Sequence, residues 1–143
     1  MPFFQNLTNG QLKILNHHLH ERRYEEDEYL FEINQPGAAL YLVSRGEVSV
    51  ETSSDPKTAT QLAIIRGGEF LGELALLDHS PRSASARAIA PTHVYALFRG
   101  DLNRLTEIEP EIACEIFKAL AWVIGERLKA TNRRIAPLKK VIG

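Results

Sequence analysis

The residues of this chain whose types and spacing best fit a chemical task lie between Phe70 and Ala88. Within this segment, Gly72 can adopt backbone angles closed to other residues and lets a ligand approach the main chain. Good helix formers follow it, so a helical turn is expected whose free N–H groups attract an anion. Arg82 comes later in the same loop, where its guanidinium can grip phosphate oxygens through two parallel hydrogen bonds.

A carboxylate beside this glycine indicates a second ligand group. Glu73 would repel a phosphate, but it can accept a hydrogen bond from a ligand hydroxyl while Arg82 balances the charge. The Ser83 hydroxyl and the N–H groups of Leu74 and Ala75 add donors. The segment therefore predicts a pocket for a small ligand that carries both a phosphate and a sugar hydroxyl.

The same segment closely resembles the phosphate-binding cassette of cyclic nucleotide-binding domains. The match runs from Gly72-Glu73-Leu74-Ala75-Leu76 to Pro81-Arg82 without insertion or deletion. The resemblance implies cyclic AMP or cyclic GMP as the ligand. It implies that the ribose 2′-hydroxyl binds Glu73 and that the cyclic phosphate binds Arg82, Ser83 and the Leu74 and Ala75 amides. By position, the residues that wall the base and ribose would be Val50, Leu62 and Ala63, which ordinary core packing explains equally well.

Length and composition favour one sensor domain over residues 1–143. A hydrophobic content of 44% argues against disorder, and a net charge of −1 provides no general attraction to nucleic acid or membrane. Cys114 is the only cysteine, which excludes an internal disulfide. No signal peptide or membrane-length apolar run is evident, so we expect a cytoplasmic protein without direct DNA or membrane binding.

The order of elements predicts a mainly β fold with flanking helices. A helix over 7–20 with Thr8 as its N-cap precedes an antiparallel β-roll or jelly roll over 21–99, which contains the cassette at 70–88. Arg45-Gly46 is expected to form a tight hairpin, and 52–60 a loop at a hairpin tip. Asp27 and Asn34 stand where the family commonly has glycine, and both residue types tolerate a left-handed backbone. The expected strands are 29–33, 40–43, 48–50, 61–65, 83–89 and 92–98.

Two helices are expected over 101–136. The short one spans 101–107, capped by Gly100 or Asp101, and the long one begins near Pro110 and stops at Pro137. The long helix is apolar on more than one face, which predicts either a homodimer through this helix or burial wholly within the monomer. Its later part resembles the catabolite activator family, where Thr131 and Asn132 would contact the base; a solvated helix end explains them equally.

Several function classes find no support in the sequence. Motifs of hydrolases, P-loop proteins, dinucleotide-binding proteins and zinc proteases are missing, so no enzymatic activity and no metal or cofactor is expected. The eight residues after Ile135 are too short for a helix-turn-helix. We expect a sensor that acts through an unknown effector protein. The alternatives are a ligand-free interaction module and a truncated DNA-binding regulator.

Overall fold

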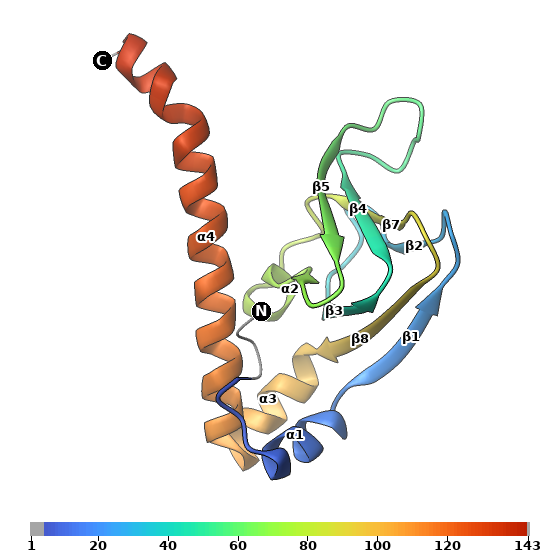
Figure 1. Ribbon diagram of the computed structural model, residues 1–143, viewed down its shortest axis with the longest axis vertical. Coiled ribbons are helices and arrows are strands. Elements are labelled where there is room, and N and C mark those ends of the chain that lie inside the picture. The colour runs from blue at the N-terminus through green and yellow to red at the C-terminus, as the bar shows by residue number, and fades with distance from the viewer. Residues whose placement is uncertain (1–4, 143) are drawn as a thin grey trace.

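The computed structural model describes the backbone of residues 5–142 and the side chains up to residue 132. The chain forms two antiparallel sheets flanked by helices (Figure 1), so the predicted antiparallel β-roll is confirmed. The elements are α1 (Asn9–Asn16), β1 (His20–Tyr24), β2 (Tyr29–Phe31), β3 (Ala39–Arg45), β4 (Glu47–Glu51), β5 (Gln61–Arg66), β6 (Phe70–Leu71), α2 (Leu74–Leu77), β7 (Ser85–Ala88), β8 (Thr92–Phe98), α3 (Arg99–Ile108) and α4 (Pro110–Ile142).

The two sheets have the strand orders β1-β8-β3-β6 and β2-β7-β4-β5. Alternate side chains of the strands point inward and form the core of the roll, because successive residues of a strand face opposite sides. Val43 and Val94 come from one sheet, and Val48 and Ala86 from the other. This core holds β4, β5 and the cassette strand β6 in fixed positions relative to one another.

The predicted tight hairpin at Arg45-Gly46 is wrong. β3 and β4 belong to different sheets, so Gly46 forms a corner at which the chain crosses between them. Its φ is +96°, and a Cβ there would lie 2.6 Å from the carbonyl oxygen of Pro91, so only glycine fits. The hairpin with a tip at 52–60 is confirmed by the pairing of β4 with β5.

The left-handed turns at Asp27 and Asn34 are confirmed, since both residues have φ of +71°. Thr8 is confirmed as the N-cap of α1, and it forms a capping box with Gln11. The helix is shorter than predicted, because it ends at Asn16. The strand β1 follows from His20, and it was missed because its outward-facing polar side chains lack an alternating apolar pattern.

The C-terminal helices also depart from the predicted limits. α3 begins at Arg99, and the Asp101 carboxylate accepts a hydrogen bond of 3.2 Å from the backbone N–H of Phe98, so neither Gly100 nor Asp101 is the cap. α4 continues past Pro137 to Ile142. A proline removes one helical hydrogen bond and disturbs the preceding turn, but this does not by itself end a helix.

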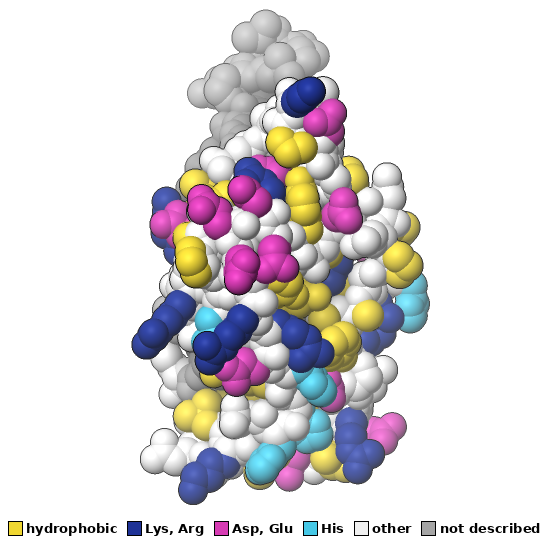
Figure 2. Space-filling view, turned by 90° about the vertical axis from the view of Figure 1, so that its right-hand side faces the viewer, with side chains coloured by type: hydrophobic (Ala, Val, Ile, Leu, Met, Phe, Trp, Pro, Cys, Tyr) yellow, Lys and Arg dark blue, Asp and Glu magenta, His cyan; other side chains and the backbone are white. Residues whose placement is uncertain are grey.

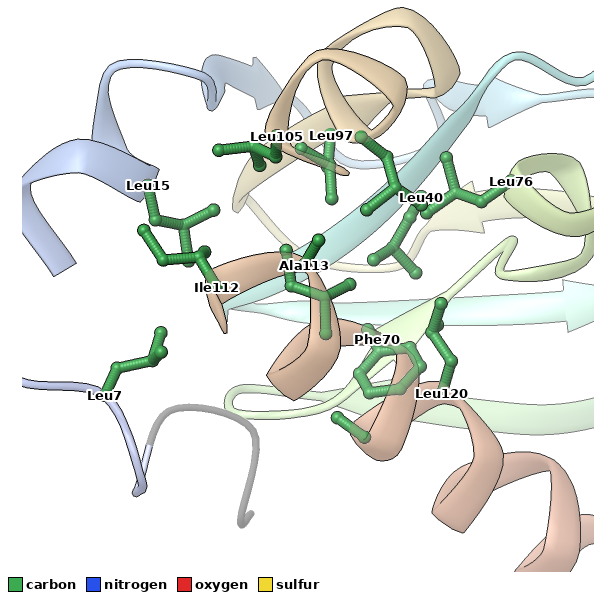
Figure 3. Packing of buried hydrophobic residues seen from close by; sticks show 13 residues of the cluster. Leu7, Leu15, Leu40, Phe70, Leu76, Leu97, Leu105, Ile112, Ala113 and Leu120 are labelled. Atoms are coloured by element: carbon green, nitrogen blue, oxygen red, sulfur yellow. The ribbon is translucent and has the colours of Figure 1, made fainter. Parts of the chain in front are cut away.

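α4 stands along one side of the roll, and its C-terminal end projects past the strands (Figure 1). Its first half is buried against a second core in which Phe70 of β6 lies near Leu120 of α4 (Figure 3). Ala113 and Leu120 of this helix are buried within the chain. Phe117, on the same side of the helix, remains 40% exposed, so that side is only partly covered, and Trp122 on the opposite side is 53% exposed.

Candidate functional site

A pocket of about 570 Å³ lies between the cassette, the strands of the second sheet and α4. The cassette contributes the segment from β6 through α2 to Ala84, the sheet contributes apolar side chains, and α4 contributes Arg127. The pocket is lined by Phe31, Val50, Ala63, Ile65, Leu71, Gly72, Glu73, Leu74, Ala75, Asp78, Ser80, Pro81, Arg82, Ser83, Ala84 and Arg127. The loop after Gly72 therefore returns to its starting point, as its composition predicted.

Arg82 is held by backbone groups of three segments. Its Nη1 donates to the Gly72 carbonyl at 3.2 Å, and its Nη2 donates to the Ala39 carbonyl at 2.8 Å. The guanidinium carbon lies 4.1 Å from the centre of the Phe31 ring. The backbone of Arg82 is fixed as well, because its N–H donates to Gln35 and its carbonyl accepts from Asn34, both at 2.8 Å.

The charge of Arg82 is buried but not neutralised. The residue is 8% exposed, and within residues 5–132 no carboxylate forms an ion pair with it. Burial lowers the pKa of its guanidinium. Its Nε has no hydrogen-bond partner among the described residues, an arrangement that costs free energy unless a ligand supplies an acceptor. The site is therefore suited to bind an anion.

The second charged group of the pocket is the buried Glu73, which is 5% exposed. Glu73 lies directly before α2, and its carboxylate forms an ion pair with Arg127 of α4. Arg127 also donates to the Phe70 carbonyl at 3.0 Å. The long helix is thus joined to the cassette at the carboxylate predicted to bind a sugar hydroxyl.

The amide donors of the pocket lie at the start of α2. The N–H of Ala75 donates to the Gly72 carbonyl at 3.2 Å, so it would share its hydrogen with a ligand. Leu74 is the first residue of α2, where a helix has no internal acceptor for the N–H. Ser83 is exposed at the pocket, and its hydroxyl is accessible.

The structure brings together most of the predicted site residues. Val50 and Ala63 line the pocket beside the cassette, but Leu62 does not, because alternation along β5 directs it to the opposite face of the sheet. Thr131 and Asn132 are exposed one turn beyond Arg127 and lie outside the pocket. The Thr131 hydroxyl donates instead to the Arg127 carbonyl at 3.0 Å.

Arg127 lines the pocket, but sequence reasoning did not assign it to the site. It is the first residue of the segment 127–132, the part of the long helix that resembles the catabolite activator family. Only Thr131 and Asn132 of this segment were assigned a role. The missed signal was an arginine one helical turn before those residues. Its partner Glu73 was predicted as a ligand group of the cassette. Nothing in the sequence indicated that a residue of the long helix would form an ion pair with it.

Other site types find no match in the described part of the chain. Between residues 5 and 132, no three His, Cys, Asp or Glu side chains gather as ligands for a metal ion. None of the described helices combines the length and apolar character needed to span a bilayer. Acidic and basic side chains are interspersed on the face of the roll seen in Figure 2.

Comparison with known proteins agrees with this geometry. Residues 21–109 match the family model described as the cyclic nucleotide-binding domain. The cyclic AMP receptor protein of Thermus thermophilus is 33% identical over 87% of this chain, which spans 58% of that protein. The crystal structure of the Thermus thermophilus catabolite activator protein superposes with a TM-score of 0.82 at 31% identity, covering 97% of this chain and 63% of that one.

A relative of another architecture is the cyclic nucleotide-gated potassium channel of Mesorhizobium japonicum. It is 31% identical over 85% of this chain, which spans 32% of the channel. The chain therefore spans less than two thirds of the length of these curated relatives.

Proposed function

Because the chain belongs to the cyclic nucleotide-binding domain family, we propose that residues 1–143 act as one regulatory domain that senses a cyclic nucleotide. The observation that carries the proposal is Arg82, a buried guanidinium without a carboxylate partner in the described residues and with an unsatisfied Nε. A cyclic phosphate supplies both the charge and the acceptors that this group lacks. Binding needs no chemical step, so the domain is not an enzyme.

Each lining group has a proposed role. Arg82, Ser83 and the amides of Leu74 and Ala75 bind the cyclic phosphate, and Glu73 accepts from the ribose 2′-hydroxyl. Val50 and Ala63, with the other apolar lining side chains, form the wall for ribose and base. We favour cyclic AMP over cyclic GMP, because the relative that is 33% identical over 87% of this chain is named for cyclic AMP. Thr131 and Asn132 stay candidates for the base only if α4 moves on binding.

The ion pair of Glu73 with Arg127 suggests how binding is signalled. A ribose hydroxyl would compete with Arg127 for the Glu73 carboxylate, and this would change the free energy of the contact between α4 and the cassette. We propose that the nucleotide thereby shifts α4 between two packings against the roll. The domain would report this change to an effector protein of the cytoplasm, without touching DNA itself.

We also propose that a second copy of the chain covers the exposed side of α4. Phe117, Trp122 and Leu128 are 40%, 53% and 59% exposed on this helix. Large apolar side chains exposed together on one helix favour burial against a partner. The alternative, in which α4 is complete within its own monomer, predicts a monomeric mass.

The test is one calorimetric titration with cyclic AMP and cyclic GMP, run beside a sizing column. We expect saturable binding of cyclic AMP, weaker binding of cyclic GMP and the mass of a dimer. A ligand that binds only the folded state also raises the melting temperature as its concentration increases. No heat and no thermal shift with either nucleotide would instead favour a ligand-free interaction module, and tight salt-dependent DNA binding would favour a DNA-binding regulator.

Glu73→Gln is expected to weaken ribonucleotides selectively. The amide retains an acceptor but loses the charge. A hydrogen bond to a charged group contributes about 1.5–3 kcal/mol and a neutral one about 0.5–1.5 kcal/mol, so cyclic AMP should bind roughly 5- to 13-fold more weakly. The 2′-deoxy analogue makes no such bond and should lose much less. The measurement is the ratio of the two affinities by calorimetry.

The ion pair in the free protein acts against the expected loss. Glu73→Gln breaks the pair with Arg127 and so removes the competitor of the ribose hydroxyl, which favours cyclic AMP over its 2′-deoxy analogue. A selective loss of cyclic AMP is therefore a lower limit for the hydroxyl contact. Glu107→Gln removes an exposed carboxylate of α3 and is the charge-matched control. Equal losses for the two ligands would contradict the ribose role.

A further inference from the structure

Arg99 lies outside the pocket lining but binds the cassette from behind. It is the first residue of α3, and its side chain turns back toward α2. Its Nε donates to the Ala75 carbonyl at 3.0 Å. Its Nη2 donates to the Gly37 carbonyl at 2.8 Å and to the Asp78 carbonyl at 3.0 Å. Its own N–H donates to the Ala38 carbonyl at 2.8 Å.

Two of the carbonyls that Arg99 binds, those of Ala75 and Asp78, lie at the end of a helix that is too short to be stable alone. α2 has four residues, and a helix of this length does not form in isolation. A helical bond of the i to i+4 type joins the Asp78 N–H to the Leu74 carbonyl at 2.9 Å. The Ala75 and Asp78 carbonyls lie at its C-terminal end, where a helix offers no internal donor and where a positive charge is favourable. Arg99 supplies both the donors and the charge.

Arg82 and Arg99 both donate to the backbone of the short segment 37–39. Arg82 donates to Ala39 from the pocket side, and Arg99 donates to Gly37 and Ala38 from the side of α3. The packing between them is tight, because a Cβ on Gly37 would lie 2.9 Å from the Ala75 Cβ and 3.2 Å from the Arg82 Nε. A shift of α2 therefore displaces the groups bound to Arg99.

The charge of Arg99 adds to that of Arg82. In the part of the chain whose side chains are described, neither guanidinium has a carboxylate partner. Their charges are close enough for Arg99 to contribute to the lowered pKa of Arg82, after burial as the main cause. Two like charges on one side of the pocket attract an anion more strongly than Arg82 alone.

We infer that Arg99 is a positioning residue, which ties α2 and the segment 37–39 to the start of α3. It keeps the N–H groups of α2 directed at the phosphate, and it passes a displacement of α2 on to α3 and α4. α3 packs directly on α4, since Leu105 shares its core cluster with Ile112 and Ile116. The inference rests on the proposed function for the identity of the ligand, but the anchoring of α2 does not depend on any ligand.

The first test follows the anchoring without nucleotide. In Arg99→Gln we expect the amide of Asp78 to exchange its hydrogen at least about tenfold faster than in the wild type, because the bonds of a charged donor are lost. The amides that pair β3 with β8 should keep their protection and show that the fold is intact. Arg99→Lys keeps the charge but lacks the planar, forked guanidinium, so exchange of the Asp78 amide should remain fast in this variant. Arg104→Gln replaces an exposed arginine of the same helix and is the matched control.

The second test separates phosphate binding from general damage to the pocket. Cyclic AMP should bind Arg99→Gln about tenfold or more weakly than the wild type, whereas adenosine, which lacks the phosphate, should change little. Affinities come from calorimetry for cyclic AMP and from chemical-shift titration for adenosine. A side chain with only a structural role would weaken both ligands alike.

The outcomes distinguish this inference from the proposed function. Unchanged exchange of the Asp78 amide in Arg99→Gln would overturn the anchoring. Equal losses for cyclic AMP and adenosine would overturn the positioning of the phosphate donors. If the wild-type protein bound neither ligand, the proposed function and the phosphate role would both fail, and the exchange comparison would still decide the anchoring of α2.

Discussion

Arg82→Ala is expected to weaken cyclic AMP binding by about 2–5 kcal/mol, or roughly 30- to several-thousand-fold. The variant removes the one guanidinium of the pocket that is buried without a carboxylate partner in the described residues. It also releases the Gly72 and Ala39 carbonyls, which Arg82 holds at 3.2 Å and 2.8 Å. Calorimetric titration of the variant and the wild type measures the effect.

Two further variants separate geometry from charge. Arg82→Lys keeps the positive charge but loses the planar fork, so its affinity should fall between those of the wild type and Arg82→Ala. Arg66→Ala removes an exposed arginine of β5 and changes the net charge by the same amount. We expect near wild-type affinity for Arg66→Ala. An unchanged affinity in Arg82→Ala would refute the assigned phosphate role.

Gly72→Ala should reduce both stability and affinity. Gly72 has φ of +78°, and a side chain in this left-handed region costs about 1–2 kcal/mol. Its Cβ would also lie 2.6 Å from the Arg82 Nη1, so the guanidinium must move away from the pocket. We expect a lower melting temperature and cyclic AMP binding weakened at least about tenfold, because charge-assisted contacts are lost. Thermal unfolding and calorimetry measure the two effects separately.

Gly68→Ala is the matched control for this prediction. Gly68 also has a positive φ, +89°, but nothing lies within 4 Å of a Cβ built there. It should lower the melting temperature through the same backbone strain and leave the affinity intact. Equal affinity losses in the two variants would mean that displacement of Arg82 is not the cause.

The grouping of residues around the pocket could be predicted where they are close in sequence. Gly72, Glu73 and Arg82 occur in one loop, and their types alone require a special backbone, a hydroxyl acceptor and an anion donor. The left-handed turns at Asp27 and Asn34 followed from residue type in the same way. Such features depend on local sterics and hydrogen bonding, so they can be predicted from the types of neighbouring residues.

Prediction failed where a contact joins distant segments. Arg127 reaches Glu73 across 54 positions, and Arg99 reaches Gly37 across 62. An arginine in a helix has no local mark that distinguishes a surface side chain from one bound to a buried carboxylate or to carbonyl groups. The corner at Gly46 was misread for a related reason, because a turn and a crossing between sheets use the same residue types.

By itself, the sequence determined the β-roll with its flanking helices and the chemistry of the cassette loop, because apolar alternation, turn residues and short-range spacing act over a few residues. Only the tertiary structure decided which partners these groups have: Arg127 on Glu73, Arg99 behind α2, and Leu62 turned away from the pocket. Those choices depend on how two sheets and the flanking helices close around two core clusters, and the packing energy that selects them is shared among residues far apart in the chain.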